Sequence, residues 1–123
     1  MKYKTTITGC GPEAFEFLSP ALDLNFVIIF NEDAPEEFAQ LSILHTKEDL
    51  LAIPSPGDTM KVGKNIYTIT AVGREVGNTL ATLGHCTLAF GGGREAYRPN
   101  CIMLEGPELT RKAITAGDTI EIY

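Results

Sequence analysis

The two histidines of this sequence, His45 and His85, are the side chains with the clearest capacity for chemistry. They are the only histidines among 123 residues, and each lies where an apolar, strand-like run meets a polar one. A neutral imidazole is available as a nucleophile near pH 7, because its unperturbed pKa is about 6.5. A hydrogen bond at one ring nitrogen fixes the tautomer and leaves the other nitrogen to attack. The alternative for His45 is a buried, structural residue that donates one N–H to a backbone carbonyl, and the residue pattern leaves both open.

His85 carries the same two alternatives, and its spacing from His45 does not decide between them. If the sheet brings the two strand ends together, His85 could hold an anionic group or position the first ring through a charge-assisted contact. A metal site made of His45, His85 and Cys86 is a third hypothesis. It has weak support, because the sequence contains no Cys-x-x-Cys or His-x-x-x-His pair. No cofactor is expected.

The cysteines and one glycine-rich segment predict structure rather than chemistry. Cys10, Cys86 and Cys101 are odd in number and widely spaced, so they do not indicate a disulfide framework, and this suits a reducing compartment. Cys86 and Cys101 lie in apolar runs and are expected to be small core residues. Residues 91–94 (GGGR) are only superficially like a phosphate loop, since the Gly-Lys-Ser/Thr ending is missing, and a hairpin tip is expected there.

The composition predicts a globular chain that folds as one domain over residues 1–123. Hydrophobic residues make up 44% and charged residues 21% of the sequence, as in ordinary soluble proteins. The net charge is −6 and no basic stripe is visible, which argues against a nucleic-acid partner and permits a basic protein partner. The longest apolar run, residues 26–30, is strand-sized, so no direct membrane insertion is expected. With no signal-peptide pattern either, we expect a cytoplasmic protein.

Most of the expected elements are short strands. Alternating or unbroken apolar runs predict strands at residues 3–8, 25–31, 41–45, 60–62, 66–72, 85–90, 101–104 and 119–123. Between its terminal asparagines, the segment 25–31 is an unbroken apolar run, which indicates a strand buried on both faces. The segments GDTMKV (57–62) and GDTIEI (117–122) repeat one pattern, and they predict two strands entered through the same Gly-Asp turn.

Helices are expected to be few and short. Residues 75–83 are the best candidate, because Val76, Leu80 and Leu83 form one stripe and Gly84 ends it. Asp33 is expected to cap a helix at residues 34–40, with Pro35 in its first turn. Shorter helical segments are expected at residues 13–18, 47–53 and 108–114. Seven or eight short strands with few helices and no βαβ alternation predict a mostly β fold, a small barrel or rolled sheet.

Five segments stand out when they are taken together and in order. They are YKTTIT (3–8), FNEDAP (30–35), ILH (43–45), TAVG (70–73) and LGHCTL (83–88). With them the chain resembles the glucitol/sorbitol-specific IIA component of the bacterial phosphotransferase system. The resemblance runs over nearly the whole chain, although no single motif in it is as specific as a phosphate loop.

The resemblance implies a phosphoryl carrier that works in sugar uptake. His45 is placed like the family's phosphorylated histidine, which accepts a phosphoryl group from the carrier protein HPr and passes it to a cysteine of the IIB domain. His85 lies in a matching segment and is the second catalytic candidate. Service to two partners in turn predicts an exposed His45 ring in a shallow apolar surface. A homo-oligomer is compatible with the sequence. The alternatives are a non-catalytic binding or regulatory module on the same barrel and a metal-binding β-domain.

Overall fold

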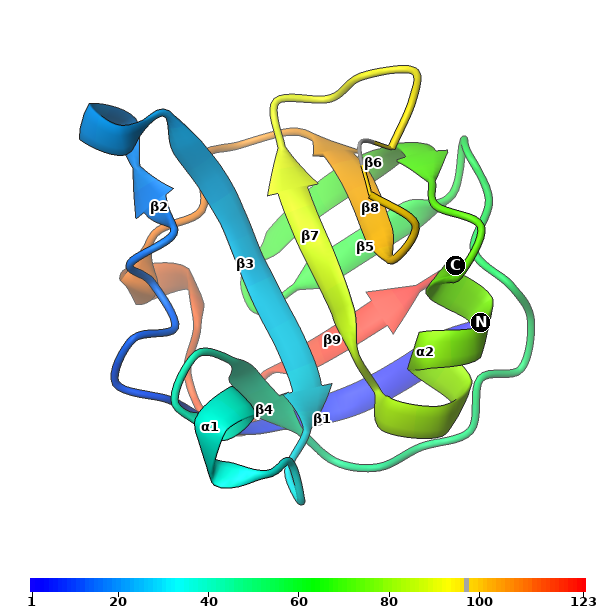
Figure 1. Cartoon of the computed structure of the whole chain (residues 1–123). Coiled ribbons are helices and arrows are strands. Elements are labelled where there is room, and N and C mark those ends of the chain that lie inside the picture. Colours follow the sequence, from blue (N-terminus) through cyan, green and yellow to red (C-terminus); the bar gives the residue numbers. More distant parts are fainter. Residues whose placement is uncertain (97) are drawn as a thin grey trace.

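The computed structural model describes residues 1–96 and 98–123, and it shows a β barrel with short helices beside it (Figure 1). The strands in these residues are β1 (Tyr3–Cys10), β2 (Leu18–Ser19), β3 (Leu24–Asn31), β4 (Ile43–His45), β5 (Thr59–Val62), β6 (Asn65–Val72), β7 (Cys86–Phe90), β8 (Cys101–Glu105) and β9 (Thr119–Ile122). Eight of them follow one another around the barrel in the order β3-β4-β1-β9-β5-β6-β8-β7, and the β3–β7 pairing closes it. The predicted mostly β barrel is confirmed.

Strand β3 has an unusual position, because it pairs with three other strands. The two-residue strand β2 pairs with its beginning, β7 runs antiparallel along its middle, and β4 runs parallel to its end. The inner face of β3 packs in the barrel interior, whereas Phe26 and Ile28 on the outer face are only half-buried, so the predicted burial on both faces is partial. The end of β3 is therefore where residues from β4 and β7 meet.

The barrel interior is filled by the side chains that alternate inward along the strands. The largest fully buried side chains are Tyr3, Ile7, Ile29, Ile43, Met60, Tyr67, Ile69, Leu80, Leu88, Ile102, Leu104 and Ile120. Full burial of one such aliphatic side chain stabilises the fold by about 1.5–3 kcal/mol relative to exposure. Cys86 and Cys101 are buried as well, as predicted.

The helices agree with the sequence in part. Helix α2 (Val76–Leu83) forms where it was predicted and ends at Gly84, which adopts the left-handed conformation with φ 60°. Helix α1 (Glu36–Ala39) is shorter than predicted, and the expected cap at Asp33 is wrong, since Pro35 occupies the cap position. A residue that precedes proline is pushed toward extended backbone, so Ala34 cannot begin the helix. None of the helices in residues 1–96 and 98–123 is long and apolar enough to cross a membrane.

Four other sequence predictions need correction. Residues 47–53 are not helical, because this segment lies beside the residue that precedes β1, and Leu51 N–H donates to Lys2 O over 2.8 Å. Residues 13–17 form successive turns instead of a helix, and residues 108–114 contain only the 3₁₀ helix η2 (Arg111–Ala113). The loop of residues 91–100, whose residue 97 lies outside the described residues, is not a hairpin tip. It joins β7 to β8, and these strands are parallel.

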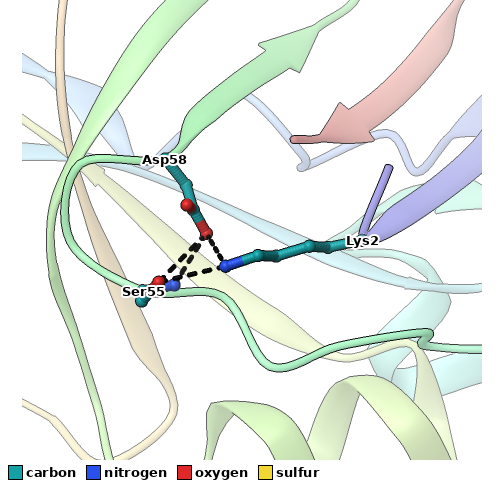
Figure 2. Close-up of polar contacts among 3 residues, drawn as sticks. All are labelled: Lys2, Ser55 and Asp58. Atoms are coloured by element: carbon teal, nitrogen blue, oxygen red, sulfur yellow. Dashed lines mark hydrogen bonds and ion pairs between the residues drawn. The ribbon is translucent and has the colours of Figure 1, made fainter.

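The repeated Gly-Asp segment forms two equivalent turns, as predicted. Gly57 and Gly117 have φ angles of 95° and 98°, and the turns that contain them lead into β5 and β9, which pair with each other. The Asp58 carboxylate accepts a hydrogen bond from Ser55 N–H and pairs with Lys2 at 2.6 Å, which ties β1 to the turn (Figure 2). Burial raises the pKa of Asp58, but the hydrogen bonds from Lys2 and Ser55 outweigh it, so the pKa lies below its usual value.

Asp118 repeats this arrangement in the second turn. Its carboxylate accepts a hydrogen bond from Thr115 N–H at 3.2 Å and pairs with Lys64 at 2.9 Å. The hydrogen bond from Lys64 holds the pKa of Asp118 below its usual value. The same sequence pattern therefore produces the same β-turn twice, and in each turn the aspartate pairs with a lysine, Lys2 in the first and Lys64 in the second.

Candidate functional site

The end of β3 brings the two histidines into one region. Asn31, the last residue of β3, lies opposite His45 in the parallel β3–β4 pair, and Ile29 lies opposite Cys86 in the antiparallel β3–β7 pair. His85 directly precedes β7, so both imidazoles belong to the same end of the barrel. In Figure 1 this is the lower end, where β3 and β4 finish and β7 begins. The two strand ends therefore meet, but the His45 ring lies inside the barrel and the His85 ring on the outer face.

His45 points into the barrel and has no exposed surface. Its Nε2 lies 2.8 Å from the carbonyl oxygen of Gly84, and its Nδ1 lies 2.9 Å from that of Thr46. The ring also meets the Tyr3 ring edge-on, with centroids 6.1 Å apart and an interplanar angle of 86°. The expectation of an exposed His45 ring in an apolar surface is therefore wrong for this conformation. Strand alternation explains the difference, because His45 shares its face of β4 with the buried Ile43.

The two carbonyl contacts of His45 restrict what its ring can do. A carbonyl oxygen can only accept a hydrogen bond, so a ring with one proton donates to Gly84 O or to Thr46 O and turns a nitrogen lone pair toward the other oxygen. In the conformation described here both ring nitrogens face carbonyl oxygens, so neither is open to a phosphoryl group.

Gly84 covers the His45 ring, and only glycine fits there. An ideal Cβ on this residue would overlap Asn31 Oδ1 and lie 2.8 Å from His45 Cε1. The positive φ of the helix-ending turn also favours glycine. The Leu83–Gly84 turn at the end of α2 therefore serves as a cover that contacts Asn31 and His45 together.

Two polar side chains beside His45 have buried atoms without a hydrogen-bond partner. They are the Tyr3 hydroxyl and the Asn31 Oδ1 atom; Thr5 Oγ1 on β1 is a third such atom in the described residues. Burial, followed by the nearby Cys86 and Glu48, raises the pKa of Tyr3 far above its usual value, so its hydroxyl keeps its proton. Buried polar groups normally find partners, and an orphan costs about 1–3 kcal/mol. The barrel interior around His45 thus contains buried polar atoms that have no hydrogen-bond partner.

His85 lies on the other face of the sheet and is half-buried. Its Nε2 accepts a hydrogen bond from Asn100 Nδ2 at 3.1 Å, which places the ring proton on Nδ1, 3.4 Å from Ile29 O. The ring packs against Phe30 with centroids 4.9 Å apart. Burial lowers the pKa of His85, although the bond to Ile29 raises it, so the ring is neutral at pH 7. The Nε2 of His85 lies on the outer face, and its lone pair is engaged by the hydrogen bond from Asn100.

A groove of about 950 Å³ runs along the outer face of β3 beside His85. Its lining includes the aromatic side chains Phe17, Phe26 and Phe38 and the polar side chains His85, Arg98 and Asn100. Phe38 on α1 stacks on Phe30 and remains 47% exposed. Four exposed acidic residues precede α1 or lie in its first turn, namely Glu32, Asp33, Glu36 and Glu37. An exposed aromatic ring with an acidic surround has the character of a protein-binding surface.

The two buried cysteines, Cys86 and Cys101, are not suited to act as nucleophiles or metal ligands in this region. Burial raises the pKa of Cys86 well above its usual value and that of Cys101 to about 11, so both thiols remain protonated. Cys86 points into the barrel and His85 out of it, and both His45 nitrogens face carbonyls. The three candidate metal ligands are therefore not directed toward a common point. In the described residues, no group of three or more His, Cys, Asp or Glu side chains is arranged to hold a metal ion.

Sequence reasoning missed Asn31, Tyr3 and the carbonyl of Gly84. Asn31 could have been noticed, because it is the polar residue that ends the apolar run of β3, one position beyond Phe30. The role of Gly84 as a cover had no local signal, since the helix-ending glycine was already explained by its conformation. Tyr3 was read only as part of an alternating strand.

Comparison with known proteins gives one consistent result. Residues 2–121 match the family described as PTS system glucitol/sorbitol-specific IIA component. The glucitol/sorbitol-specific EIIA components of Escherichia coli (strain K12) and Shigella flexneri are each 35% identical over 105 residues, which cover 85% of this chain and 82% of the relative. A crystal structure of a PTS system IIA component from Enterococcus faecalis V583 matches with a TM-score of 0.76 and 26% identity, over 97% of this chain and 98% of that one. The chain belongs to the glucitol/sorbitol-specific IIA family of the sugar phosphotransferase system, and it is a phosphoryl carrier in sugar uptake.

Proposed function

We propose that this carrier acts in the cytoplasm, accepts a phosphoryl group from phospho-HPr on Nε2 of His45, and passes the group to a cysteine of a IIB domain. The proposal is supported by the position of the Leu83–Gly84 turn, which covers the Nε2 of His45. The Nδ1 of the ring faces the neighbouring carbonyl of Thr46, while the Nε2 faces the carbonyl of Gly84, in a turn 39 residues away. A bond to Thr46 O keeps the proton on Nδ1, so Nε2 is the nitrogen that becomes a nucleophile when the turn moves.

The carrier then has a closed and an open state. In the closed state the carbonyl oxygens of Gly84 and Thr46 face the two ring nitrogens. The tautomer with its proton on Nδ1 turns the Nε2 lone pair toward the Gly84 oxygen, and this repulsion favours displacement of the Leu83–Gly84 turn. The ring form that can attack is thus the form that the closed turn does not tolerate. A buried nucleophile of this kind is protected until a partner docks.

The transfer itself is balanced and needs no cofactor chemistry. The Nε2 lone pair of His45 forms the new N–P bond while the N–P bond of the donor's phosphohistidine breaks, and the donor nitrogen keeps that electron pair. In the second step a cysteine thiolate of the acceptor attacks phosphorus, and the electron pair returns to Nε2. Such transfers depend mainly on in-line positioning and on groups that stabilise the phosphoryl oxygens.

Phosphoryl uptake by the wild-type protein tests the proposal directly. The protein is incubated with phosphoenolpyruvate and the general phosphotransferase proteins, and its intact mass is measured before and after acid treatment. We expect one phosphoryl group that is labile in acid and stable in base, located at residue 45 by peptide sequencing. Failure to take up a phosphoryl group from a donor that phosphorylates another IIA protein would contradict the proposed function.

His85 is a second candidate for the acceptor, and one observation favours it. It is the half-buried imidazole that lines the outer groove, and its Nε2 becomes able to attack if the hydrogen bond from Asn100 breaks. Under our proposal it has a supporting role instead, as a neutral donor near the entry point of the phosphoryl group. Its Nδ1–H lies at the long distance of 3.4 Å from Ile29 O, so this proton is weakly engaged and available to a phosphoryl oxygen.

Replacement of His85 by glutamine tests this supporting role. We expect His85→Gln to slow phosphoryl uptake by about 10²-fold, the typical effect of a lost stabilising donor. The rate is measured at equal folded fraction, together with the free energy of unfolding in urea. If only the stability falls and the rate per folded molecule is unchanged, His85 is structural.

The acidic surround of α1 is expected to guide a basic partner surface. Reversal of four exposed acidic residues to lysine should slow association with the donor, and the wild-type rate should fall as salt is added, because steering is screened beyond a Debye length of about 8 Å. The four residues are Glu32, Asp33, Glu36 and Glu37.

A matched control separates this local effect from net charge. The control reverses four other exposed acidic residues, Glu75, Glu95, Glu105 and Glu108, and so makes the same change in net charge. Stopped-flow mixing with phospho-HPr gives the association rate of both variants. Equal slowing in the two variants, or no salt dependence, would show that the α1 surround has no role in docking.

A further inference from the structure

We propose that Asn31 binds the phosphoryl group while it is attached to His45, an inference that rests on the proposed function. Asn31 lies opposite His45 in the β3–β4 pair, and it is only 5% exposed. Its Oδ1 is buried without a hydrogen-bond partner. No part of the proposed mechanism so far uses this side chain.

The unpaired oxygen of Asn31 lies at the surface that Gly84 covers. A Cβ on Gly84 would overlap Asn31 Oδ1 and lie 2.8 Å from His45 Cε1, so the Gly84 Cα fills the space between the amide and the ring. When the Leu83–Gly84 turn moves, the amide of Asn31 and the Nε2 of His45 border the same vacated space. A phosphoryl group on Nε2 must occupy that space.

The chemistry of an amide suits this position. A phosphoryl group presents acceptor oxygens with negative charge, and the Asn31 amide carries two N–H donors besides its oxygen. Half a turn about the terminal side-chain bond exchanges the oxygen for the NH₂ group, and this torsion is broad and soft. In the closed state the amide directs its oxygen toward Gly84; in the phosphorylated state it directs an N–H toward the phosphoryl oxygens. The unpaired oxygen destabilises the closed state, and the same amide then stabilises the phosphorylated state by donating a hydrogen bond.

Side-chain amide resonances test the contact in the wild-type protein. Asn31 is assigned in a ¹H–¹⁵N spectrum, and the phosphoryl group is added through the general phosphotransferase proteins. We expect the Asn31 NH₂ pair to shift strongly on phosphorylation, while the NH₂ pair of Asn78, which is exposed on α2, stays in place. A phosphorylated His45 with an unmoved Asn31 amide overturns this inference alone. Phosphorylation of a different residue overturns it together with the proposed function.

Substitution provides the second test. Asn31→Asp keeps the shape but places a carboxylate against the phosphoryl group, so we expect about 10²-fold slower uptake, a shifted ³¹P resonance and faster loss of the group. Asn31→Ala is expected to slow uptake by about tenfold. Asn78→Asp, the same substitution at an exposed position, should leave all three quantities unchanged. Uptake by Asn31→Asp at the wild-type rate per folded molecule contradicts the inference.

Discussion

His45→Gln should take up no phosphoryl group from a donor that fully phosphorylates the wild-type protein. A glutamine amide cannot form the phosphorylated intermediate, so the expected loss is complete. Glutamine is chosen because its amide can still donate to the Gly84 or Thr46 carbonyl and so preserves part of the buried hydrogen bonding. Intact-mass measurement after incubation gives the result.

The matched control is His85→Gln, the same substitution at the other histidine. This variant should become phosphorylated, more slowly than the wild type. If His45→Gln still takes up the group and His85→Gln does not, the acceptor is the histidine of the outer groove. A His45→Ala variant should also be inert, but we expect it to lose about 3 kcal/mol of stability, because it leaves a cavity and removes the hydrogen bond that the ring donates.

The sequence predicted the barrel, its main strands and helix α2, because local patterns and tertiary structure agree there. Alternating strands such as β6 pack one face against the core, and the stripe of Val76 and Leu80 on α2 does the same. The helix predicted at residues 47–53 does not form. Leu51 and Ile53 are exposed, and the Leu51 N–H donates to the Lys2 carbonyl instead of to a carbonyl within a helix.

The sequence nominated candidate residues but could not describe their surroundings. Residue type and the family resemblance selected His45 as the candidate nucleophile and His85 as a candidate for a supporting role. Burial of His45 was also within reach, since the two-residue period of a strand places it on the face of Ile43. The cover could not be inferred, because the contact of Gly84 with His45 joins segments 39 residues apart in the sequence. Nothing local indicates which carbonyl a buried imidazole will meet.

Gly84→Ala is the substitution expected to affect stability most strongly for a single added methyl group. The Cβ would overlap Asn31 Oδ1, would crowd His45, and would sit on a residue with φ 60°. We expect a loss of about 3–4 kcal/mol, made up of about 1–2 kcal/mol for the left-handed backbone and the remainder for overpacking. Urea unfolding of the variant and the wild type measures the difference.

Two controls show whether the cost comes from the contact with the site. Gly57→Ala adds a methyl group at another positive φ, but no atom lies within 4 Å of its Cβ, so it should cost only the backbone term. In the double variant Asn31→Ala, Gly84→Ala the overlapping amide is absent, so the two substitutions should be non-additive by at least about 1 kcal/mol. Additive costs, or equal costs for Gly57→Ala and Gly84→Ala, would mean that Gly84 does not press on Asn31. The cover would then be an ordinary helix end, and opening at His45 would need another cause.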